Sequence, residues 1–470
     1  MYTPIVFICA LAAQPIQLDG TFEEWSPSIT GAGSQGYVYL QMLLPRPVNL
    51  QGLTEPMTLK LDWDNDITTG RKVEEGSGAI GGVLPGVDLE ILFSPKRGSR
   101  GSGVSIRRSC DRGMKSWDVV DLVFSPTYAN DRFEIRLPRT LTLEDTALVA
   151  GSTMPWELSW VDPTPTRGIA TVAATVPTTA PVLSGPLKLA AGSDIRVVTW
   201  NLEKGNLLKQ REAVIRVLAA MEPDIVLIQE IEDGQTEQDL AEVLQAAMPG
   251  AQWTTALSPR SGTIKSGIAT RLPARAVPSF KKLKRRGEPH GHVRAAALGI
   301  TIPNLGNVLA VSAHLKCCGI AGGPEDLKRI SEVMAIRRAV AAAETAVNYR
   351  GLVIGGDLNL VGGLLPLQLL VAQGEGLIER RDTLGDLLIV EAMQPDGSGV
   401  QTWQEDGQSY TPGQLDFIVV TGSSLKPTNS LVLDTQDIPE RALREMNLER
   451  DDTALASDHL PVFVDLKPAR

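Results

Sequence analysis

The sequence predicts two domains of different class, an all-β sandwich followed by a domain in which strands alternate with helices. The chain has 470 residues, which is more than one hydrophobic core usually organises. Its first part contains short apolar runs separated by Gly, Pro and Asn, whereas strand and helix patterns alternate from residue 194 onward. A stretch rich in proline and threonine, residues 161–194, separates the two patterns.

The composition is that of an ordinary globular protein. Hydrophobic residues make up 43% and charged residues 21% of the chain. After the N-terminal segment, no apolar run reaches the roughly 18 residues that would span a membrane. The formal net charge of -10 disfavours tight, non-specific binding to a polyanion, but it is compatible with a nuclease that releases its substrate. We expect a monomer.

The N-terminal segment has two interpretations. Residues 5–13 form an apolar run that ends in small residues, as in a secretory signal. No Lys or Arg precedes the run, so the pattern is incomplete, and a buried first strand is the alternative. On the first interpretation, residues 1–13 are a signal peptide and the mature protein is secreted or periplasmic.

The first domain, residues 14–176, has the pattern of a β-sandwich. Its short apolar runs are separated by turn residues, and no amphipathic helix of convincing length lies between them. These runs include YVYLQMLL, MTLKLDW, VDLEILF, WDVVDLVF and RFEIRL. Residues 177–193 are the expected linker, because they are rich in proline and threonine.

The second domain, residues 194–467, alternates strands with helices. DIRVVTWNL, PDIVLIQEI, NVLAVSAHL and GLVIGGDLNL are predicted strands. LLKQREAVIRVLAAM, EQDLAEVLQAAM and EDLKRISEVMAIRRAVAAAETAV have helical spacing of their apolar residues. Such alternation predicts a layered α/β architecture.

Polar residues lie at the ends of the strands predicted in the second domain. Any one of them is compatible with an ordinary turn. Together they are of the types that bind hard metal ions and transfer protons, so they indicate one site built on the rim of a sheet. The residues are Asn201, Glu230, His314, Asp357, Asn359, Asp416, Asp458 and His459.

The residue types at these positions fit phosphoester hydrolysis. The oxygens of Glu230, Asp458 and Asn201 are suited to Mg²⁺ or Mn²⁺, and such a metal neutralises charge on a phosphoryl group. Asp357 and Asn359 are suited to aligning and deprotonating a water molecule. A histidine beside a carboxylate, as in the Asp458–His459 pair, can be held protonated toward a phosphate.

Two further segments contain basic residues. Arg294 is a candidate for binding phosphate through its planar guanidinium, and Asn201 is a second candidate for phosphate binding as well as for the metal. His290 and His292 follow the basic run KKLKRR, residues 281–286. They are either metal ligands or, as we favour, part of an exposed loop.

The motifs of the second domain, taken together, resemble those of the endonuclease/exonuclease/phosphatase superfamily, which includes deoxyribonuclease I, abasic-site endonucleases, bacterial sphingomyelinases and inositol-polyphosphate 5-phosphatases. The resemblance covers about residues 194–467. Each motif is weak alone, but they occur in the order found in the family. The motifs are TWNLEKGN, LIQEIED, SGIATRLP, SAHLK, GGDLNL, QLDFIVV and SDHLPV.

The resemblance implies a fold and a set of roles. The fold is a deoxyribonuclease I-like four-layer α/β-sandwich, with two face-to-face sheets and helices outside. Glu230 would bind the divalent metal, with Asn201 and Asp458 nearby. Asp357 would activate water beside Asn359. His459 would be the essential histidine, oriented by Asp416, and His314 would match a second histidine found in the deoxyribonuclease I, sphingomyelinase and phosphatase branches.

The first domain more weakly resembles family 9-like carbohydrate-binding domains, in the segments IQLDGTFEEW, LDWDNDITTG and GVDLEILF. That resemblance implies a β-sandwich that often binds Ca²⁺, and it suggests carbohydrate as a second partner. Asp62, Asp64 and Asp66 alternate as calcium ligands would, although an acidic surface turn has the same pattern. Sugar binding requires exposed aromatic rings, and Trp25, Trp63 and Trp117 are either such rings or core residues.

The sequence does not decide whether two of the cysteines form a disulfide. The chain has four cysteines. Cys9 would leave with a signal peptide and Cys110 stands alone in the sequence. The adjacent Cys317 and Cys318 form either a vicinal disulfide or two separate thiols.

The leading functional prediction is a secreted endonuclease that hydrolyses phosphodiester bonds of nucleic acid with a divalent metal. The first alternative is a phospholipid phosphodiesterase of the sphingomyelinase type, or a phosphatase. A third possibility is a surface sugar-binding protein with a vestigial catalytic domain, which the presence of every catalytic residue type disfavours.

Overall fold

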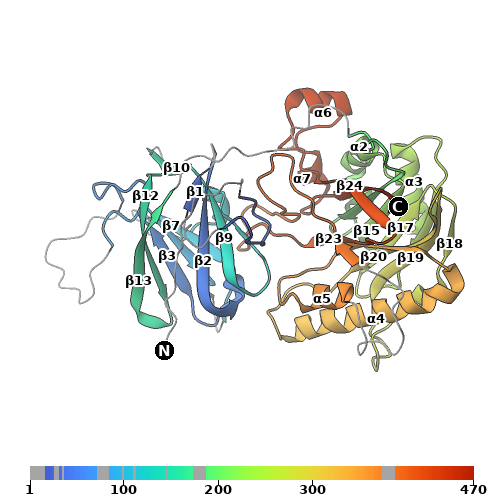
Figure 1. Ribbon diagram of the computed structural model, residues 1–470, viewed down its shortest axis with the longest axis horizontal. Helices are drawn as coiled ribbons and strands as arrows, with labels where there is room; N and C mark the ends of the chain where they lie inside the picture. The colour runs from blue at the N-terminus through green and yellow to red at the C-terminus, as the bar shows by residue number, and fades with distance from the viewer. Residues whose placement is uncertain are drawn as a thin grey trace. The chain divides into compact units, whose positions relative to one another are not determined.

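A computed structural model describes residues 16–25, 31–33, 36–70, 84–97, 100–108, 113–143, 146–172, 187–372 and 387–469. The chain forms two compact units (Figure 1). The β unit consists of Met1–Thr179 with Gln404–Gly413, and the α/β unit of Ala180–Trp403 with Gln414–Arg470. The expected signal peptide, residues 177–186 of the expected linker, Cys9 and Cys110 lie outside the described residues.

Two antiparallel sheets form the β unit. One has the order β1 (Gly31–Gly33), β2 (Tyr37–Val48), β9 (Asn130–Pro138), β8 (Val123–Ser125). The other has the order β13 (Asp162–Thr171), β12 (Thr153–Trp160), β3 (Met57–Leu61), β4 (Leu89–Phe93), β7 (Val104–Arg108). Two short pairs are added by β5 (Lys96–Arg97) with β6 (Arg100–Gly101), and by β10 (Thr140–Leu143) with β11 (Thr146–Val149).

One hydrophobic core lies between the two sheets. It joins apolar side chains of β2 and β9 to those of β3, β4 and β12, as a β-sandwich requires. Trp63 and Trp117 belong to this core, and Trp25 packs in a smaller cluster on β2; all three are buried. These three rings are therefore core residues and not an exposed platform for sugar.

The β unit also contains a segment from late in the sequence. Gln404–Gly413 is assigned to this unit. Two hydrogen bonds hold the segment: Val104 N of β7 donates to Ser409 O at 2.6 Å, and Thr411 N donates to Gln51 Oε1 at 2.9 Å. Sequence patterns did not predict this insertion, because these residues are polar and lack strand periodicity.

Two mixed six-stranded sheets form the centre of the α/β unit. Sheet I has the order β16 (Thr254–Leu257), β17 (Ile264–Thr270), β15 (Ile225–Glu232), β14 (Ile195–Asn201), β25 (Val462–Pro468), β24 (Leu425–Val432). Sheet II has the order β18 (Ala274–Ala276), β19 (Arg294–Ile302), β20 (Gly306–His314), β21 (Gly351–Asp357), β23 (Asp416–Thr421), β22 (Leu387–Ile389).

Alternation along β14 shows how sheet I is buried on both faces. Val197 packs in the core between the sheets, together with Ala310 and Val353 of sheet II. Its neighbour Val198 packs in a second core with residues of the outer helices, such as Val214, because successive strand residues face opposite ways. The predicted four-layer α/β-sandwich is confirmed.

Helices cover the outer faces of both sheets (Figure 1). The outer core of sheet I includes residues of α2, α3 and α6, and α4 packs on β20 of sheet II. Helix α3 begins with a capping box between Thr236 and Asp239, and α4 ends at Asn348 in the left-handed conformation. The helices are α1 (Asn206–Lys209), α2 (Arg211–Met221), α3 (Glu237–Ala247), α4 (Pro324–Val347), α5 (Leu365–Val371), α6 (Glu440–Met446) and α7 (Asp452–Ala456), and the short 3-10 helices are η1 (Leu50–Gly52), η2 (Trp117–Val120) and η3 (Pro278–Phe280).

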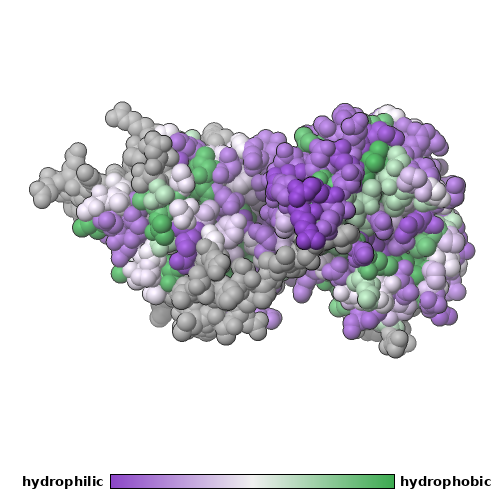
Figure 2. Space-filling view, turned by 90° about the horizontal axis from the view of Figure 1, so that it is seen from above, coloured by the Kyte–Doolittle hydropathy of each residue, from purple (hydrophilic) through white to green (hydrophobic). Residues whose placement is uncertain are grey.

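The surface over α6 is strongly hydrophilic (Figure 2). The helix contributes Glu440, Arg441, Arg444 and Glu445, with an Arg441–Glu445 bond of 2.8 Å. Since its acidic and basic groups pair with one another, this is a solvated helix face of balanced charge. None of the helices in the described part of the chain combines the length and apolar character needed to cross a membrane.

Close packing within sheet II requires glycine at Gly356. Its φ is +149°, and a Cβ atom there would lie 1.8 Å from the carbonyl oxygen of Ala313 on β20. Any side chain would therefore push β21 away from β20. The next residue is Asp357, so this glycine sets the position of a predicted catalytic carboxylate.

Candidate active site

Four predicted site residues form one row across sheet II. Arg294 is opposite His314, His314 is beside Asp357, and Asp357 is opposite Asp416 in the registers of adjacent strands. Neighbouring strands lie about 4.8 Å apart, so the four side chains line one end of the sheet. Residues up to 122 positions apart in sequence (416 minus 294) become neighbours through this register.

Sheet I and the loop before β25 supply the other side of the site. Asn201 is the last residue of β14, and Asp458 and His459 precede β25. Glu230 lies in β15 at a register shift between Ile228 and Ile231, and its φ is +60°. A left-handed conformation at a residue other than glycine is costly and is typical of functional sites.

The closest contact across the site joins His459 to Asp416. His459 Nδ1 and Asp416 Oδ2 are 2.7 Å apart, and both residues are buried. Burial disfavours the imidazolium, but the charge of Asp416 and its hydrogen bond outweigh this effect and raise the pKa of His459 to about 10. His459 is therefore a cation at neutral pH, with Nε2 facing Asp357 Oδ2 at 3.9 Å.

Asp357 is held by two amide side chains. Asn201 Nδ2 donates to its Oδ2 at 3.0 Å, and Asn359 donates to both oxygens, from Nδ2 at 2.8 Å and from its backbone N–H at 2.9 Å. Burial raises the pKa of Asp357 to about 7, although the charge of His459 acts in the opposite direction. A carboxylate with this pKa is suited to accept a proton from water near neutral pH.

The orientation of Asn201 differs from that of a metal ligand. Its amide nitrogen faces Asp357 and lies 3.5 Å from Glu230 Oε1, while its amide oxygen accepts from the backbone N–H of Glu203 at 3.1 Å. In this arrangement, Asn201 presents a hydrogen-bond donor to the site. That favours the predicted contact with phosphate over metal ligation.

His314 is the second histidine of the site. It is buried, with Nε2 3.4 Å from Asp357 Oδ2 and 3.9 Å from Glu230 Oε1. Burial lowers its pKa well below the ordinary value, and the nearby cations Arg294 and His459 lower it further. His314 is therefore neutral, so the two histidines of the site carry different charges.

Glu230 and Asp458 are the acidic residues suited to a divalent metal. Each is half-buried, Glu230 Oε2 accepts from the Lys204 N–H at 2.9 Å, and Asp458 Oδ2 accepts from Trp403 Nε1 at 2.9 Å. No Lys or Arg side chain is paired with either carboxylate in the ion pairs of the described residues. Two oriented carboxylates beside His459⁺ fit a hard cation better than a soft one.

Arg294 lies at the edge of the site, where its Nη2 donates to the Leu315 carbonyl at 2.8 Å. Asn359 Nδ2 reaches the same carbonyl at 3.3 Å. The guanidinium is half-buried and has further donors, which is compatible with the predicted phosphate contact.

Sequence reasoning missed several residues that position the site. Thr402 donates to Asp416 Oδ2 at 2.8 Å and accepts from the Asp416 backbone N–H at 2.9 Å. Ser457 donates to the Asn201 carbonyl at 2.7 Å and accepts from the His459 N–H at 3.0 Å. Ser457 could have been found from its place in the motif SDHLPV, whereas Thr402 and Trp403 carry no local pattern that indicates their role.

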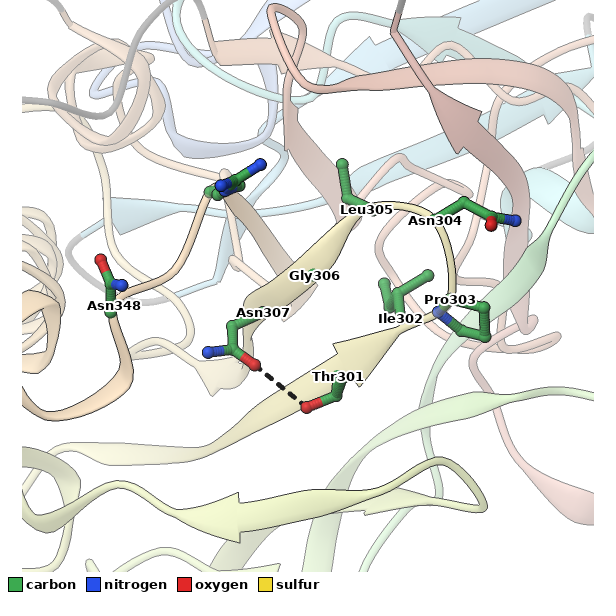
Figure 3. A pocket seen from close by; sticks show the side chains of 9 residues that line it. Thr301, Ile302, Pro303, Asn304, Leu305, Gly306, Asn307 and Asn348 are labelled. Atoms are coloured by element: carbon green, nitrogen blue, oxygen red, sulfur yellow. Dashed lines mark hydrogen bonds between the residues drawn. The ribbon is translucent and has the colours of Figure 1, made fainter.

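Other candidates lie apart from this row. His290 is exposed on a loop and His292 is half-buried beside Lys284, so neither joins the acidic residues. A surface hollow at the β19–β20 turn, lined by Thr301, Asn307 and Arg350 among others, contains a Thr301–Asn307 hydrogen bond of 3.0 Å (Figure 3). It lies at the end of β19 and β20 opposite to Arg294 and His314, so it is separate from the site.

Known proteins share this arrangement of motifs. The profile of the Endonuclease/Exonuclease/phosphatase family matches residues 198–459, more than half of the chain. The chain belongs to the endonuclease/exonuclease/phosphatase family. The α/β unit is accordingly a metal-dependent phosphoesterase domain, whereas the β unit has no identified family.

Solved structures match more than half of the chain. An endonuclease/exonuclease/phosphatase from Bacteroides vulgatus is 17% identical with a TM-score of 0.40, covering 58% of this chain and 99% of that one. The human Nocturnin catalytic domain with bound sulfate is 19% identical, with a TM-score of 0.37 and coverage of 58% and 94%. Truncated TDP2 from Caenorhabditis elegans is 17% identical, with a TM-score of 0.37 and coverage of 59% and 99%. A comparison with curated proteins found no match.

The geometry predicts separate defects for the adjacent residues Asp458 and His459. His459→Ala removes the cation facing Asp357, and loss of such a group costs about 10² to 10⁴ in kcat. Asp416→Asn should cause a smaller loss of the same kind. Asp458→Ala should instead shift the dependence on Mg²⁺ to higher concentration. Steady-state kcat measured against Mg²⁺ concentration compares the three variants, and rescue of His459→Ala by excess Mg²⁺ would contradict these roles.

Proposed function

We propose that the chain is a secreted endonuclease that hydrolyses phosphodiester bonds of nucleic acid with a divalent metal. The observation that supports hydrolysis is the placement of a protonated His459 opposite Asp357, with the paired Asp416 behind the imidazole. A cation and a basic carboxylate facing one space suit a phosphoester and an attacking water. The apolar run at residues 5–13 supports secretion.

Each residue has a defined task in this proposal. Asp357, fixed by Asn201 and Asn359, accepts the proton of the attacking water. His459⁺ faces a phosphate oxygen and stabilises the charge that develops there. The bound cation supplies a Lewis acid that neutralises phosphoryl charge, and Glu230 and Asp458 would hold it. Carboxylate oxygens favour Mg²⁺, with Mn²⁺ as the alternative.

An exposed basic segment favours a polyanionic substrate. Lys281, Lys282, Lys284 and Arg286 are exposed. Leu283 O accepts from the Val293 N–H at 3.1 Å, which places this segment beside the residue that precedes Arg294. Several cations at the border of a phosphate site are an electrostatic footprint of nucleic acid, and they act locally even though the whole chain has a net charge of -10.

The same segment disfavours the sphingomyelinase-type alternative. Membrane-inserting surfaces present large apolar side chains to solvent. Among the described residues, no exposed large apolar side chain lies between Lys281 and Val293. Phe280 and Leu283 are both buried. A lipid headgroup therefore has a less suitable surface here than a nucleic acid.

The direct test compares substrates under one condition. Purified protein with Mg²⁺ should cleave plasmid DNA or RNA in preference to sphingomyelin and inositol phosphates, and EDTA should abolish the activity. Glu230→Gln should require more Mg²⁺ because one ligand charge is lost. Gel and phosphate-release assays measure both effects. Preferential turnover of sphingomyelin would overturn the nuclease assignment, and an unchanged Mg²⁺ titration would remove Glu230 from the metal site.

The basic segment gives a second prediction. Lys282→Glu should raise KM for duplex DNA and reduce the slope of log KM against log salt, since each lost phosphate contact changes such a slope by about 1. Turnover of a small phosphodiester should stay within about twofold. Arg350→Glu is the matched control, because it makes the same charge change at the opposite end of β20. Equal effects of the two variants would show that net charge, and not this segment, is responsible.

The β unit contains a second group of acidic residues that suits a hard cation. Oxygens of Asp62, Asp64 and Asp88 all lie within 4.8 Å of one another. Asp62 and Asp88 are 1% and 2% exposed, and the Oδ1 atom of each has no hydrogen-bond partner. Burial raises the pKa of both carboxyls to about 6, and the charge of Asp64 adds to the rise.

This group differs from the predicted one. Asp66 is exposed, and its Oδ1 accepts from the Thr68 N–H at 2.9 Å, so it closes a turn, whereas Asp88 occupies the third position of the cluster. The sequence predicted Asp62, Asp64 and Asp66 as the Ca²⁺ ligands, and the geometry favours Asp88 over Asp66 as the third. We infer that Ca²⁺ is held by Asp62, Asp64 and Asp88, because buried unpaired carboxylate oxygens require either protons or a cation.

Two asparagine variants test this cation site. Ca²⁺ at about 100 times its Kd would stabilise the unit by about 2.7 kcal/mol, so the thermal midpoint of the full chain should rise on adding Ca²⁺. Asp88→Asn should lose that rise, whereas Asp66→Asn should retain it. Differential scanning calorimetry with Ca²⁺ or EDTA measures the change. Loss of the rise in Asp66→Asn, with retention in Asp88→Asn, would restore the ligand set predicted from sequence.

A further inference from the structure

Two adjacent cysteines lie just beyond the active-site row. Cys317 and Cys318 follow β20, three and four residues after His314, and are not in a disulfide. The Cys318 thiol contacts Cys317 Sγ at 2.9 Å, and Lys316 Nζ lies 3.2 Å from the same sulfur. Cys317 is half-buried and Cys318 is exposed. The half-buried Cys317 sulfur is thus in contact with both an exposed thiol and a cation.

The backbone around the two cysteines is fixed by a buried arginine. Arg329, which is fully buried, donates from Nη1 to the carbonyls of Lys316 at 2.7 Å and Cys318 at 2.8 Å. Cys318 and Gly319 have φ angles of +69° and +82°, so the chain turns sharply at the pair. One guanidinium thus holds the carbonyls of Lys316 and Cys318 and fixes the backbone that carries both thiols.

The neighbours of the sulfurs make one thiol reactive. The hydrogen bond from Cys318 and the ammonium of Lys316 lower the pKa of Cys317 to about 5, despite its partial burial. The same hydrogen bond raises the pKa of Cys318. Cys317 is therefore a thiolate at neutral pH and is the nucleophile of the pair.

We propose that Cys317 and Cys318 are a modification site, a vicinal dithiol that hydrogen peroxide converts into a disulfide within the chain. The Cys317 thiolate attacks one peroxide oxygen, the O–O bond breaks, and water leaves after one proton is taken up. The Cys318 sulfur then attacks the Cys317 sulfenic acid, the S–O bond breaks, and a second water leaves. Two thiols and one peroxide thus give one disulfide and two waters.

The disulfide should be readily reduced again. Cα atoms joined by a trans peptide are about 3.8 Å apart, closer than the 4.4 to 6.8 Å usual for bridged cysteines. A strained disulfide has a more oxidising potential than a structural one. Reversal takes two electrons from a dithiol such as dithiothreitol, which restores both thiols and itself becomes a cyclic disulfide.

Peptide mass analysis tests the pair in the full-length protein. Trypsin cleaves after Lys316 and Lys328, so one peptide, residues 317–328, contains both cysteines. After hydrogen peroxide followed by alkylation, this peptide should be unalkylated and lighter by two hydrogens than the reduced, unalkylated form. Brief dithiothreitol treatment should reverse the change. A cross-link from this peptide to Cys9 or Cys110, or independent oxidation of both sulfurs to sulfinic acid, would overturn the proposal.

Two serine variants separate the roles of the sulfurs. Cys318→Ser keeps a hydroxyl donor beside Cys317, so a sulfenic acid should accumulate there and be trapped by dimedone. Cys317→Ser should give roughly tenfold less dimedone adduct at Cys318, because that thiol is mostly protonated. Equal labelling would contradict the assignment. Should either variant fail to fold, the mass of the wild-type peptide still decides between an internal disulfide and other products.

Discussion

The ion pair between His459 and Asp416 is the interaction on which the active site depends. Asp416 belongs to sheet II and His459 to the loop before β25 of sheet I, so their 2.7 Å contact joins the two halves of the α/β unit at the catalytic end. Both groups are buried, and an unpaired buried charge costs about 3 to 5 kcal/mol. The pairing therefore makes each group depend on the other across the two sheets, and it keeps the imidazole positive toward the space where a phosphate would bind.

The positions of the other polar groups in the site depend on the two sheets lying close enough for this contact. Gly356 allows β21 to lie against β20 directly before Asp357. Deeper between the sheets, Gln229 of sheet I donates to Ser312 of sheet II at 3.0 Å, and both are fully buried. These bonds fix the separation at which Asn201 reaches Asp357. The two histidines carry different charges as a consequence, since His459 is hydrogen-bonded to a buried carboxylate, whereas burial and the nearby cations Arg294 and His459 keep His314 neutral.

Sequence patterns predicted the site residues at strand ends because the strands of an α/β-sandwich are apolar runs. A polar residue that ends such a run can be recognised in the sequence. They could not place residues whose role is set by tertiary contact. Thr402 supports Asp416 from outside any strand, Asp88 is distant in sequence from Asp62 and Asp64 although their oxygens lie within 4.8 Å of one another, and the orientation of Asn201 depends on Glu203. The predicted helix over residues 207–221 divides at Gln210 into α1 and α2, which periodicity alone does not show.

The charge of His459 is the most direct measure of this account. The chain has only four histidines, so NMR can follow the ring of His459 during a pH titration of the metal-free protein in EDTA, with His459→Gln providing the assignment. The account predicts that His459 remains protonated through neutral pH, with a pKa of about 10, and that Asp416→Asn lowers this pKa. A wild-type pKa at or below the ordinary value of about 6.5 would contradict it.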